Sequence, residues 1–308
     1  MLQTFNLTKV YPGVTAVKDL SFTLERGDLF GFIGPNGAGK TTTIKMLATL
    51  LEPTSGTATI DGHDIGDDPD GVRAVIGYMP DYFGVYDDVK VWEYLDFFAA
   101  AYRIPKAQRP QLINDVLELT DLTIKRDTYV EALSRGMKQR LCLAKTLVHD
   151  PKLLLLDEPA SGLDPRARIE IKELLKELRR LGKTILISSH ILPELADMCN
   201  KIGIIEQGEL IVWGPVDEIM RKVTPTRKLE ITLADRAAEA AKALEGYDGV
   251  KDVRVTGNSI SISLDGSDET QVNLLQHLVS KGFAVRSFAE EETDLEDIFM
   301  RVTRGAVQ

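Results

Sequence analysis

The segment GPNGAGKTT, residues 34–42, combines three glycines with a lysine and two threonines in a spacing that could hold phosphate. It fits the pattern G-x-x-x-x-G-K-[ST], and it follows an apolar run, LFGFI (29–33), that is typical of a buried strand. Glycines let successive backbone N–H groups turn toward one anion, and the start of the following helix adds its own. Lys40 can reach the β- and γ-phosphates of a nucleoside triphosphate, and the Thr41 hydroxyl can hold Mg²⁺. The predicted phosphate-binding residues are Gly34, Pro35, Asn36, Gly37, Ala38, Gly39, Lys40, Thr41 and Thr42.

Two further apolar runs end in side chains that could act on a phosphate. LLLLDEP (153–159) contains Asp157 and Glu158, and TILISSH (184–190) ends in His190. In open α/β sheets, ligands bind at the carboxyl ends of the strands. We therefore expect Asp157 to bind Mg²⁺ through water, Glu158 to deprotonate an attacking water, and His190 to contact the γ-phosphate. Without the phosphate loop, a polar pair before a proline and a structural histidine would be the simpler interpretations.

The segment LSRGMKQR, residues 133–140, begins a predicted helix with an unusual concentration of positive charge. Ser134 is a suitable N-cap. Arg135, Lys138 and Arg140, however, lie near the end of the helix whose dipole is already positive, where each cation costs about 0.3–1 kcal/mol if nothing compensates it. Either these side chains point into solvent, where screening makes the cost small, or an anion binds at the start of the helix.

Composition and charge narrow the class of protein. The chain has 308 residues, enough for two domains, and its 44% hydrophobic and 27% charged residues are typical of a soluble globular protein. A net charge of −10 argues against broad nucleic-acid binding, which depends on a positive surface. The apolar runs are far shorter than a bilayer span, no signal peptide is evident, and Cys142 and Cys199 are expected to be reduced thiols, so we expect a cytoplasmic protein.

The pattern of apolar residues predicts the elements that position these side chains. LSFTLERGD (20–28) and TATIDG (57–62) alternate apolar and polar residues, so both are predicted strands with one buried face. Three runs are apolar throughout, as in central parallel strands covered by helices on both faces: 29–33, 153–156 and 184–188. Besides the helix after Ser134, helices are predicted at 91–102, 106–119 and 166–182.

The C-terminal part has a different order of elements. After a short linker at 223–227, the pattern predicts strand, helix, strand, strand, helix and strand, the β-α-β-β-α-β order of a ferredoxin-like domain. A last helix is predicted to start at a capping box formed by Thr293 and Glu296. This part has no residues with an identifiable chemistry, so a scaffold or regulatory role is its default interpretation.

Together, the segments GPNGAGKTT, LSRGMKQR, LLLLDEP, SGLD (161–164) and TILISSH resemble the ATP-binding cassette (ABC) family. The resemblance covers residues 1 to about 222. It implies an α/β phosphate-loop NTPase fold with a mixed-sheet core, an antiparallel β subdomain and an α-helical subdomain at about 88–148. The linker at 223–227 and a small α+β domain at 228–308 would follow this cassette of residues 1–222.

The resemblance also implies roles for residues outside the phosphate loop. In this family the nucleotide lies between two cassettes, so Ser134 and Gly136 would bind the γ-phosphate of ATP held by a second chain. Asp164 would approach the partner's phosphate loop. Tyr11 in KVYPG would stack on adenine, although a surface tyrosine at a strand end is the alternative.

Three positions depart from the family pattern. Asp81 stands where the family usually has a glutamine that senses Mg²⁺, and its carboxylate could still bind the metal. Arg135 replaces a glycine and Met137 replaces a glutamine in the serine-glycine motif. Because Ser134 and Gly136 remain, γ-phosphate binding should remain too. The three departures would instead affect the rate of ATP hydrolysis and its coupling to the permease.

The function implied by the resemblance is that of the ATP-hydrolysing subunit of a membrane transporter. Its cofactors would be ATP and Mg²⁺, and its catalytic residues would be Glu158, His190 and Lys40. Two copies, as an ATP-dependent homodimer, would dock from the cytoplasmic face of the cell membrane on a separate integral membrane permease, with no nucleic acid as a partner. The tail TDLEDIFMRVT (293–303) is reminiscent of the ATPase subunits of multicomponent exporters.

Two alternatives from other classes remain. One is a soluble ATPase that acts on ribosomes or nucleic acid, although such relatives usually have two cassettes or long coiled coils, and the acidic charge counts against it. The other is a nucleotide switch that no longer hydrolyses ATP, as Asp81 and Met137 suggest. The intact Lys40, Glu158 and His190 argue against that alternative.

Overall fold

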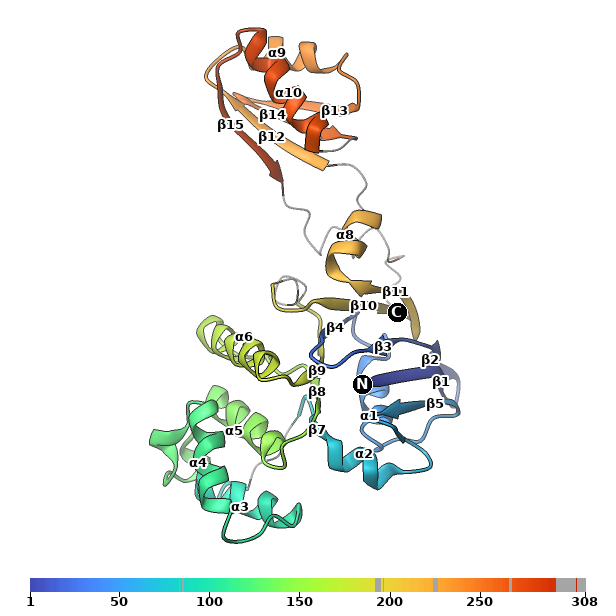
Figure 1. The fold of residues 1–308 in the computed structure, drawn as a ribbon, viewed down its shortest axis with the longest axis vertical. Helices are drawn as coiled ribbons and strands as arrows, with labels where there is room; N and C mark the ends of the chain where they lie inside the picture. The colour runs from blue at the N-terminus through green and yellow to red at the C-terminus, as the bar shows by residue number, and fades with distance from the viewer. Residues whose placement is uncertain are drawn as a thin grey trace. The chain divides into compact units, whose positions relative to one another are not determined.

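The structure, a computed structural model, describes residues 1–82, 84, 86–191, 195, 197–223, 227–265, 268–291 and 303. The chain divides into two compact units, with the division between Val216 and Asp217. Within the described ranges, no helix is both long and apolar enough to span a bilayer. Figure 1 labels the elements of each unit.

The first unit contains a six-stranded sheet that confirms the predicted central strands. Its order is β11-β10-β4-β9-β8-β7, and all neighbours are parallel except the β10–β11 hairpin. The strands are β4 (Leu29–Ile33), β7 (Ile76–Met79), β8 (Leu153–Asp157), β9 (Thr184–Ser189), β10 (Lys201–Glu206) and β11 (Glu209–Pro215). Every residue of β4, β8 and β9 is buried, as expected for strands covered on both faces.

A second, antiparallel sheet packs beside this one. It has the order β2-β1-β5-β6, with the short β3 paired to β1. Its strands are β1 (Leu2–Tyr11), β2 (Val14–Leu20), β3 (Thr23–Leu24), β5 (Ser55–Ile60) and β6 (His63–Asp64). Aromatic side chains from both sheets meet in the core, where the rings of Phe22 and Phe30 stack with centroids 5.2 Å apart.

The predicted strand at 20–28 is wrong in its extent. Leu20 ends β2, and only Thr23 and Leu24 form β3. The chain then turns, because Gly27 has a φ of +80° and the Asp28 carboxylate accepts a hydrogen bond of 2.7 Å from the Glu25 N–H. The alternation of apolar and polar residues continues past the strand into this turn, which the Asp28 carboxylate closes. The alternation alone therefore predicted too long a strand.

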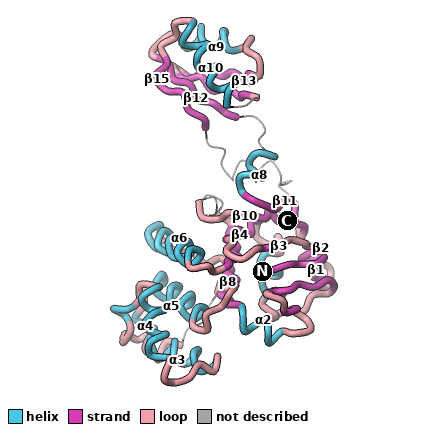
Figure 2. The backbone as a smooth tube through the Cα atoms, viewed as in Figure 1, coloured by secondary structure: helices cyan, strands magenta, loops and turns pink. Residues whose placement is uncertain are grey.

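The helices of the first unit include a group far from the antiparallel sheet (Figures 1 and 2). This group comprises α3 (Val91–Ala101), α4 (Arg109–Leu119), α5 (Arg135–Leu147) and the 3₁₀ turns η1 (Thr123–Lys125) and η2 (Val130–Ala132). The other helices are α1 (Lys40–Leu47), α2 (Pro69–Val75) and α6 (Pro165–Arg180). The helix expected from residue 106 starts at Arg109, with Pro110 in its first turn, where a missing N–H is tolerated.

The second unit has the predicted β-α-β-β-α-β order. It contains β12 (Arg227–Leu233), α9 (Ala237–Leu244), β13 (Val250–Thr256), β14 (Ser259–Leu264), α10 (Asp268–Ser280) and β15 (Val285–Glu291), with the sheet order β13-β14-β12-β15. Side chains of α9 and α10 pack with those of β12 and β14 in a separate core. Helix α8 (Val216–Val223) precedes β12. Residues 224–226 of the expected linker, and the predicted capping box at Thr293, lie outside the described residues.

Candidate functional site

The loop between β4 and α1 brings backbone N–H groups close together, and its glycines are required by the packing around it. Gly37 and Gly39 have φ values of +80° and +107°, which side chains rarely adopt. A Cβ at Gly39 would lie 2.4 Å from the carbonyl oxygen of Ala16, and one at Gly34 would lie 2.4 Å from that of Ile205. The loop therefore depends on glycine both for its turn and for its close contact with neighbouring strands.

Lys40 is held inside this loop. Its Nζ donates hydrogen bonds to the carbonyls of Gly34 at 2.6 Å and Pro35 at 3.2 Å, and it lies 3.8 Å from a carboxylate oxygen of Glu158. Burial lowers the pKa of the Lys40 amine below its usual value, while the carboxylates of Glu158 and Asp157 oppose this shift. An amine in this position can bind an oxyanion that enters the loop.

Side-chain oxygen atoms of α1, β8 and β9 lie close together beside the loop. The Thr41 hydroxyl of α1 donates to Asp157 Oδ1 at 3.2 Å, and the Ser188 hydroxyl of β9 donates to the same oxygen at 2.7 Å. Asp157, at the end of β8, is almost fully buried. A hydroxyl and a carboxylate are the hard oxygen ligands that Mg²⁺ prefers, so Thr41 and Asp157 fit a magnesium site that a bound triphosphate would complete.

Glu158 and His190 form a pair at the same edge of the sheet. His190 Nδ1 lies 2.8 Å from Glu158 Oε2, and the other carboxylate oxygen of Glu158 faces Lys40. The Glu158 N–H donates to the Ser188 hydroxyl at 3.0 Å, which fixes the backbone at this point. Such a pair, with a carboxylate oriented by an imidazole, can accept a proton from water held next to the loop.

These residues line one cavity of about 310 Å³. Its walls are formed by the phosphate loop, the polar residues that follow the strands, Ala16 of β2 and Ser161: Ala16, Pro35, Asn36, Gly37, Ala38, Gly39, Lys40, Thr41, Thr42, Asp81, Glu158, Ser161 and His190. The predicted residues Gly34 and Asp157 are not among these lining residues. The predicted loop residues thus come together with Asp81, Glu158 and His190. Ala16 and Ser161 are additions to the predicted residues, although Ser161 belongs to the segment SGLD (161–164), in which the sequence had indicated Asp164.

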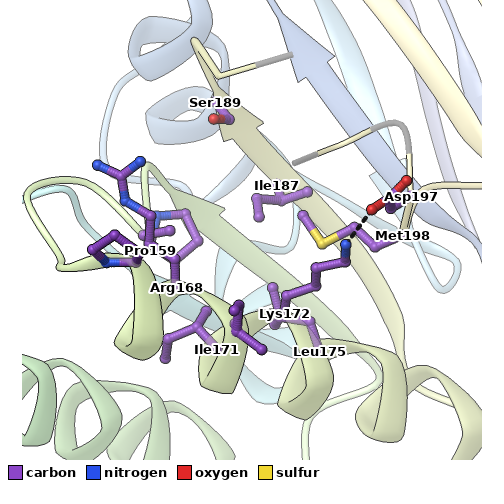
Figure 3. A pocket seen from close by; sticks show the side chains of 12 residues that line it. Pro159, Arg168, Ile171, Lys172, Leu175, Ile187, Ser189, Asp197 and Met198 are labelled. Carbon is purple, nitrogen blue, oxygen red and sulfur yellow. Dashed lines mark hydrogen bonds and ion pairs between the residues drawn. The ribbon is translucent and has the colours of Figure 1, made fainter. Parts of the chain in front are cut away.

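A second cavity nearby has a different character. It measures about 350 Å³ and lies between α6 and β9, on the far side of Pro159 (Figure 3). Ile171, Leu175, Ile187 and Met198 supply an apolar lining, with an ion pair between Lys172 and Asp197 at its side. It includes none of the phosphate-loop residues, so the smaller, polar cavity is the candidate site.

Four predicted binding residues lie away from the cavity that contains the phosphate loop. Ser134, Gly136 and Asp164 line a separate cavity of about 290 Å³ at the starts of α5 and α6. Ser134 accepts a hydrogen bond of 3.3 Å from the Met137 N–H, and Asp164 accepts one of 2.9 Å from the Ala167 N–H, so each also caps its own helix. Tyr11, at the end of β1, is exposed and has Lys9 Nζ 5.5 Å from its ring centroid. An adenine contact by Tyr11 stays a prediction.

The cations at the start of α5 are compensated in a way that the sequence did not indicate. Lys138 pairs with Asp87 at 2.9 Å, and Arg140 pairs with Asp121 at 2.8 Å. Neither solvent nor a bound anion is needed to explain these two side chains, because carboxylates distant in the sequence neutralise them. Arg135 differs, since its guanidinium donates to the carbonyl oxygen of Ser161 at 3.4 Å.

Gln139 is a structural link that sequence patterns do not reveal. Its side-chain amide is buried and donates to the carbonyl oxygen of Pro159, next to Glu158. A polar residue among the apolar positions of α5 is the only signal for it. The hydrogen bond connects the middle of α5 to the segment that carries the carboxylate pair.

Comparisons with known proteins agree with this geometry. The family model "ABC transporter" matches residues 17–161, and the model "ATP-binding protein DrrA1-3-like, C-terminal domain" matches residues 214–303. The chain is 32% identical over 305 residues to the linearmycin resistance ATP-binding protein LnrL of Bacillus subtilis, which covers 98% of both chains. It is 33% identical over 304 residues to the daunorubicin/doxorubicin resistance ATP-binding protein DrrA of Streptomyces peucetius, covering 98% of this chain and 92% of that protein.

Solved structures share the fold of the first unit. The ATP-binding subunit of an ABC transporter matches with a TM-score of 0.65 and 31% identity, over 72% of this chain and 92% of that one. A dimeric post-hydrolysis state of the ATP-binding cassette MJ0796, bound to ADP and Pi, matches with a TM-score of 0.63 and 25% identity, over 70% and 99% of the respective chains.

Proposed function

Because the chain belongs to the ATP-binding subunits of ABC transporters and is an ATPase of that family, we propose that it drives export of a substrate through a separate integral membrane permease. The full-length similarity carries this proposal. Relatives named for linearmycin and daunorubicin/doxorubicin resistance, and the Nod factor export ATP-binding protein I of Burkholderia lata (33% identical, covering 98% of this chain and 97% of that protein), align along both units. Residues 1–222 would be the catalytic cassette, with a helical subdomain at about 88–148, and residues 228–308 an accessory domain.

In the proposed reaction, this chain's residues position a water and the γ-phosphate of ATP. Glu158 accepts a proton from the water while the water oxygen bonds to the γ-phosphorus and the bond from that phosphorus to the bridging oxygen breaks, which leaves ADP and phosphate. His190 orients the Glu158 carboxylate through their 2.8 Å contact. Lys40 moves from the loop carbonyls to the phosphate oxygens and stabilises their charge. Mg²⁺, held by Thr41, Asp157 and Asp81, would neutralise charge on the phosphates.

The proposed active centre needs two chains. Ser134, Gly136 and Asp164 line a cavity separate from the one with Lys40 and Glu158, so in one chain they do not share a pocket with the phosphate loop. A second copy would bring its Ser134 and Gly136 to the γ-phosphate, where the start of a 13-residue helix favours negative charge. The dimeric cassette bound to ADP and Pi is a precedent for such an assembly among the similar structures. The dimer would associate peripherally with the cytoplasmic face of the membrane, on its permease.

The substitution Glu158→Gln tests the assignment of the base. We expect it to keep ATP binding, to lower the rate of phosphate release by about a hundredfold or more, and to accumulate an ATP-bound dimer. Phosphate release and light scattering with Mg²⁺-ATP measure these effects. The matched control is Glu173→Gln, which removes an exposed carboxylate from α6 and should leave the rate unchanged. Normal phosphate release from the Glu158→Gln variant would exclude Glu158 as the base, and a strictly monomeric variant would exclude the shared active centre.

A further inference from the structure

The start of α5 packs closely on the segment 161–164 of the same chain. A Cβ added at Gly162 would lie 2.3 Å from Nη2 and 2.5 Å from Cζ of Arg135, so the guanidinium rests against the backbone of Gly162. A Cβ at Gly136 would lie 3.3 Å from the Cβ of Ala167, in the first turn of α6. The two helix starts therefore lie close together: a Cβ at Gly162, whose φ is +66°, would displace the end of the Arg135 side chain, and one at Gly136 would press on Ala167.

Arg135 is used differently from the cations that follow it. Within the part of the chain that the structure describes, no carboxylate lies within ion-pair distance of its guanidinium, whereas Lys138 and Arg140 are paired. Its hydrogen bond to the Ser161 carbonyl, at 3.4 Å, is long for an N–H···O contact. The close fit against Gly162 is thus the main contact that this side chain makes.

The segment under Arg135 connects the two cavities of one chain. Ser161 lines the cavity that contains the phosphate loop, and its N–H donates to the Glu158 carbonyl at 3.0 Å. Gly162 and Asp164 line the cavity that contains Ser134. Consecutive residues of this segment thus line both cavities of one chain.

We propose that Arg135 is a positioning residue that clamps the segment 161–164 to the start of α5 and thereby couples the two ATP sites of a dimer. The inference rests on the proposed function, because each chain must serve its own ATP through Lys40 and Glu158 and the partner's ATP through Ser134. A glycine at position 135 could make neither the contact with Gly162 nor the hydrogen bond to Ser161. The replacement of glycine by arginine thus adds a link inside each chain and leaves Ser134 and Gly136 in place.

The dependence of hydrolysis on ATP concentration tests this coupling. We expect a Hill coefficient above 1 for the unmodified chain and a coefficient near 1 for Arg135→Gly, with nucleotide affinity changed by less than about twofold. Arg135→Lys should behave like Arg135→Gly, because an ammonium keeps the charge but lacks the planar group that lies on Gly162. Arg180→Ala, which removes an exposed arginine from the far end of α6, is the matched control and should keep the wild-type coefficient.

Other values of the Hill coefficient would contradict the inference. A Hill coefficient of 1 in the unmodified chain, or a wild-type coefficient in Arg135→Gly, would overturn the inference while leaving the proposed function intact. Full recovery in Arg135→Lys would overturn it too, since charge alone would then account for the effect. If the unmodified chain did not dimerise in the presence of ATP, that result would instead contradict the proposed function.

A double-mutant cycle with Gly162→Ala measures the contact itself. In the unmodified chain the new methyl group meets the Arg135 guanidinium, and we expect kcat/KM to fall about tenfold or more. In the Arg135→Gly background only the strain of the left-handed φ of +66° remains, so the loss should be about threefold or less. Melting midpoints of all four chains show whether each is folded. Equal losses in the two backgrounds would mean that Arg135 does not clamp this segment.

Discussion

At the scale of single residues, Glu158 adopts a backbone conformation that its type disfavours. Its φ is +50°, in the left-handed region, and it directly follows the buried Asp157 of β8. Hydrogen bonds to Ser188 and the contact with His190 hold it there. Strain of this kind concentrates at functional sites, because the surrounding structure must determine one orientation of the side chain. The carboxylate is therefore fixed in its direction before substrate binds.

Asp81→Gln tests how far this site depends on a carboxylate at position 81. Asp81 lines the phosphate-loop cavity, and a glutamine there would still offer an oxygen ligand while removing one negative charge. We expect ATPase activity to be retained within about threefold, with a changed dependence on Mg²⁺ concentration. Titration of the hydrolysis rate with Mg²⁺ measures both, with Asp88→Gln, at an exposed position, as the control. Complete loss of activity would assign the carboxylate a role that an amide oxygen cannot fill.

At the scale of elements, α5 organises the region between the sheet and the other helices. Ser134 caps its start, Lys138 and Arg140 hold Asp87 and Asp121, and Gln139 binds the carbonyl of Pro159. These bonds spread over one helix and reach three other segments of the chain, at Asp87, Asp121 and Pro159. Movement of α5 would therefore be felt both at the carboxylate pair and at the loop that follows Asp81.

His149, the second residue after the end of α5, leads us to predict a pH effect on stability. His149 is largely buried, its ring stacks on that of Tyr102 with centroids 3.7 Å apart, and its Nε2 lies 2.7 Å from the Ile76 carbonyl oxygen. Among the residues that the structure describes, its Nδ1 has no hydrogen-bond partner. Burial lowers the pKa of His149 below its ordinary value of 6.5, although the hydrogen bond to Ile76 opposes the shift. Below pH 6.5 the unfolded chain binds a proton before the folded chain does, so the free energy of unfolding should fall as the pH falls.

Denaturant unfolding between pH 7 and pH 5 measures this effect. We expect the pH dependence to be weaker in His149→Gln, and to be unchanged in the control His277→Gln, which alters a histidine of the second unit. If the free energy of unfolding depended on pH as steeply in His149→Gln as in the unmodified chain, the pKa of this imidazole would not differ between the folded and unfolded states.

At the scale of the whole molecule, the two units have separate cores. Leu229, Ile231, Leu274 and Leu278 belong to the core of the second unit, whereas Phe22 and Phe30 belong to that of the first. Relatives that align over both units include proteins named for resistance and for Nod factor export, and neither a soluble ATPase for ribosomes or nucleic acid nor a switch without hydrolysis is supported. The second unit is thus part of what this chain shares with these proteins.

Differential scanning calorimetry should show a separate unfolding transition for each of the two cores. Leu278→Ala removes a fully buried side chain of α10 and should destabilise the second unit by about 2–5 kcal/mol, while its neighbour Val279→Ala, at an exposed position, should have little effect. ATP at a hundred times its Kd should stabilise the first unit by about 2.7 kcal/mol and leave the second transition in place. A single transition that shifts as a whole in both experiments would show that the units unfold together.

The phosphate loop, the buried strands β4, β8 and β9 with the polar residues that end β8 and β9, and the order of elements in the second unit could all be predicted from the sequence. These features are local: they depend on glycine, on short apolar runs and on side chains a few residues apart, and such patterns specify turns and strands directly. The extent of the strand at 20–28 could not be read in this way, because a carboxylate three residues ahead closes the turn.

Which atoms meet in the site could be learned only from the packed chain. The pairing of Glu158 with His190, of Lys138 with Asp87 and of Gln139 with Pro159 joins residues 20 to 51 positions apart. The contact of the Arg135 guanidinium with Gly162 likewise joins two segments 27 positions apart. Charge and hydrogen-bonding capacity are properties of a residue, but the partner that satisfies them is chosen by the packing of distant elements.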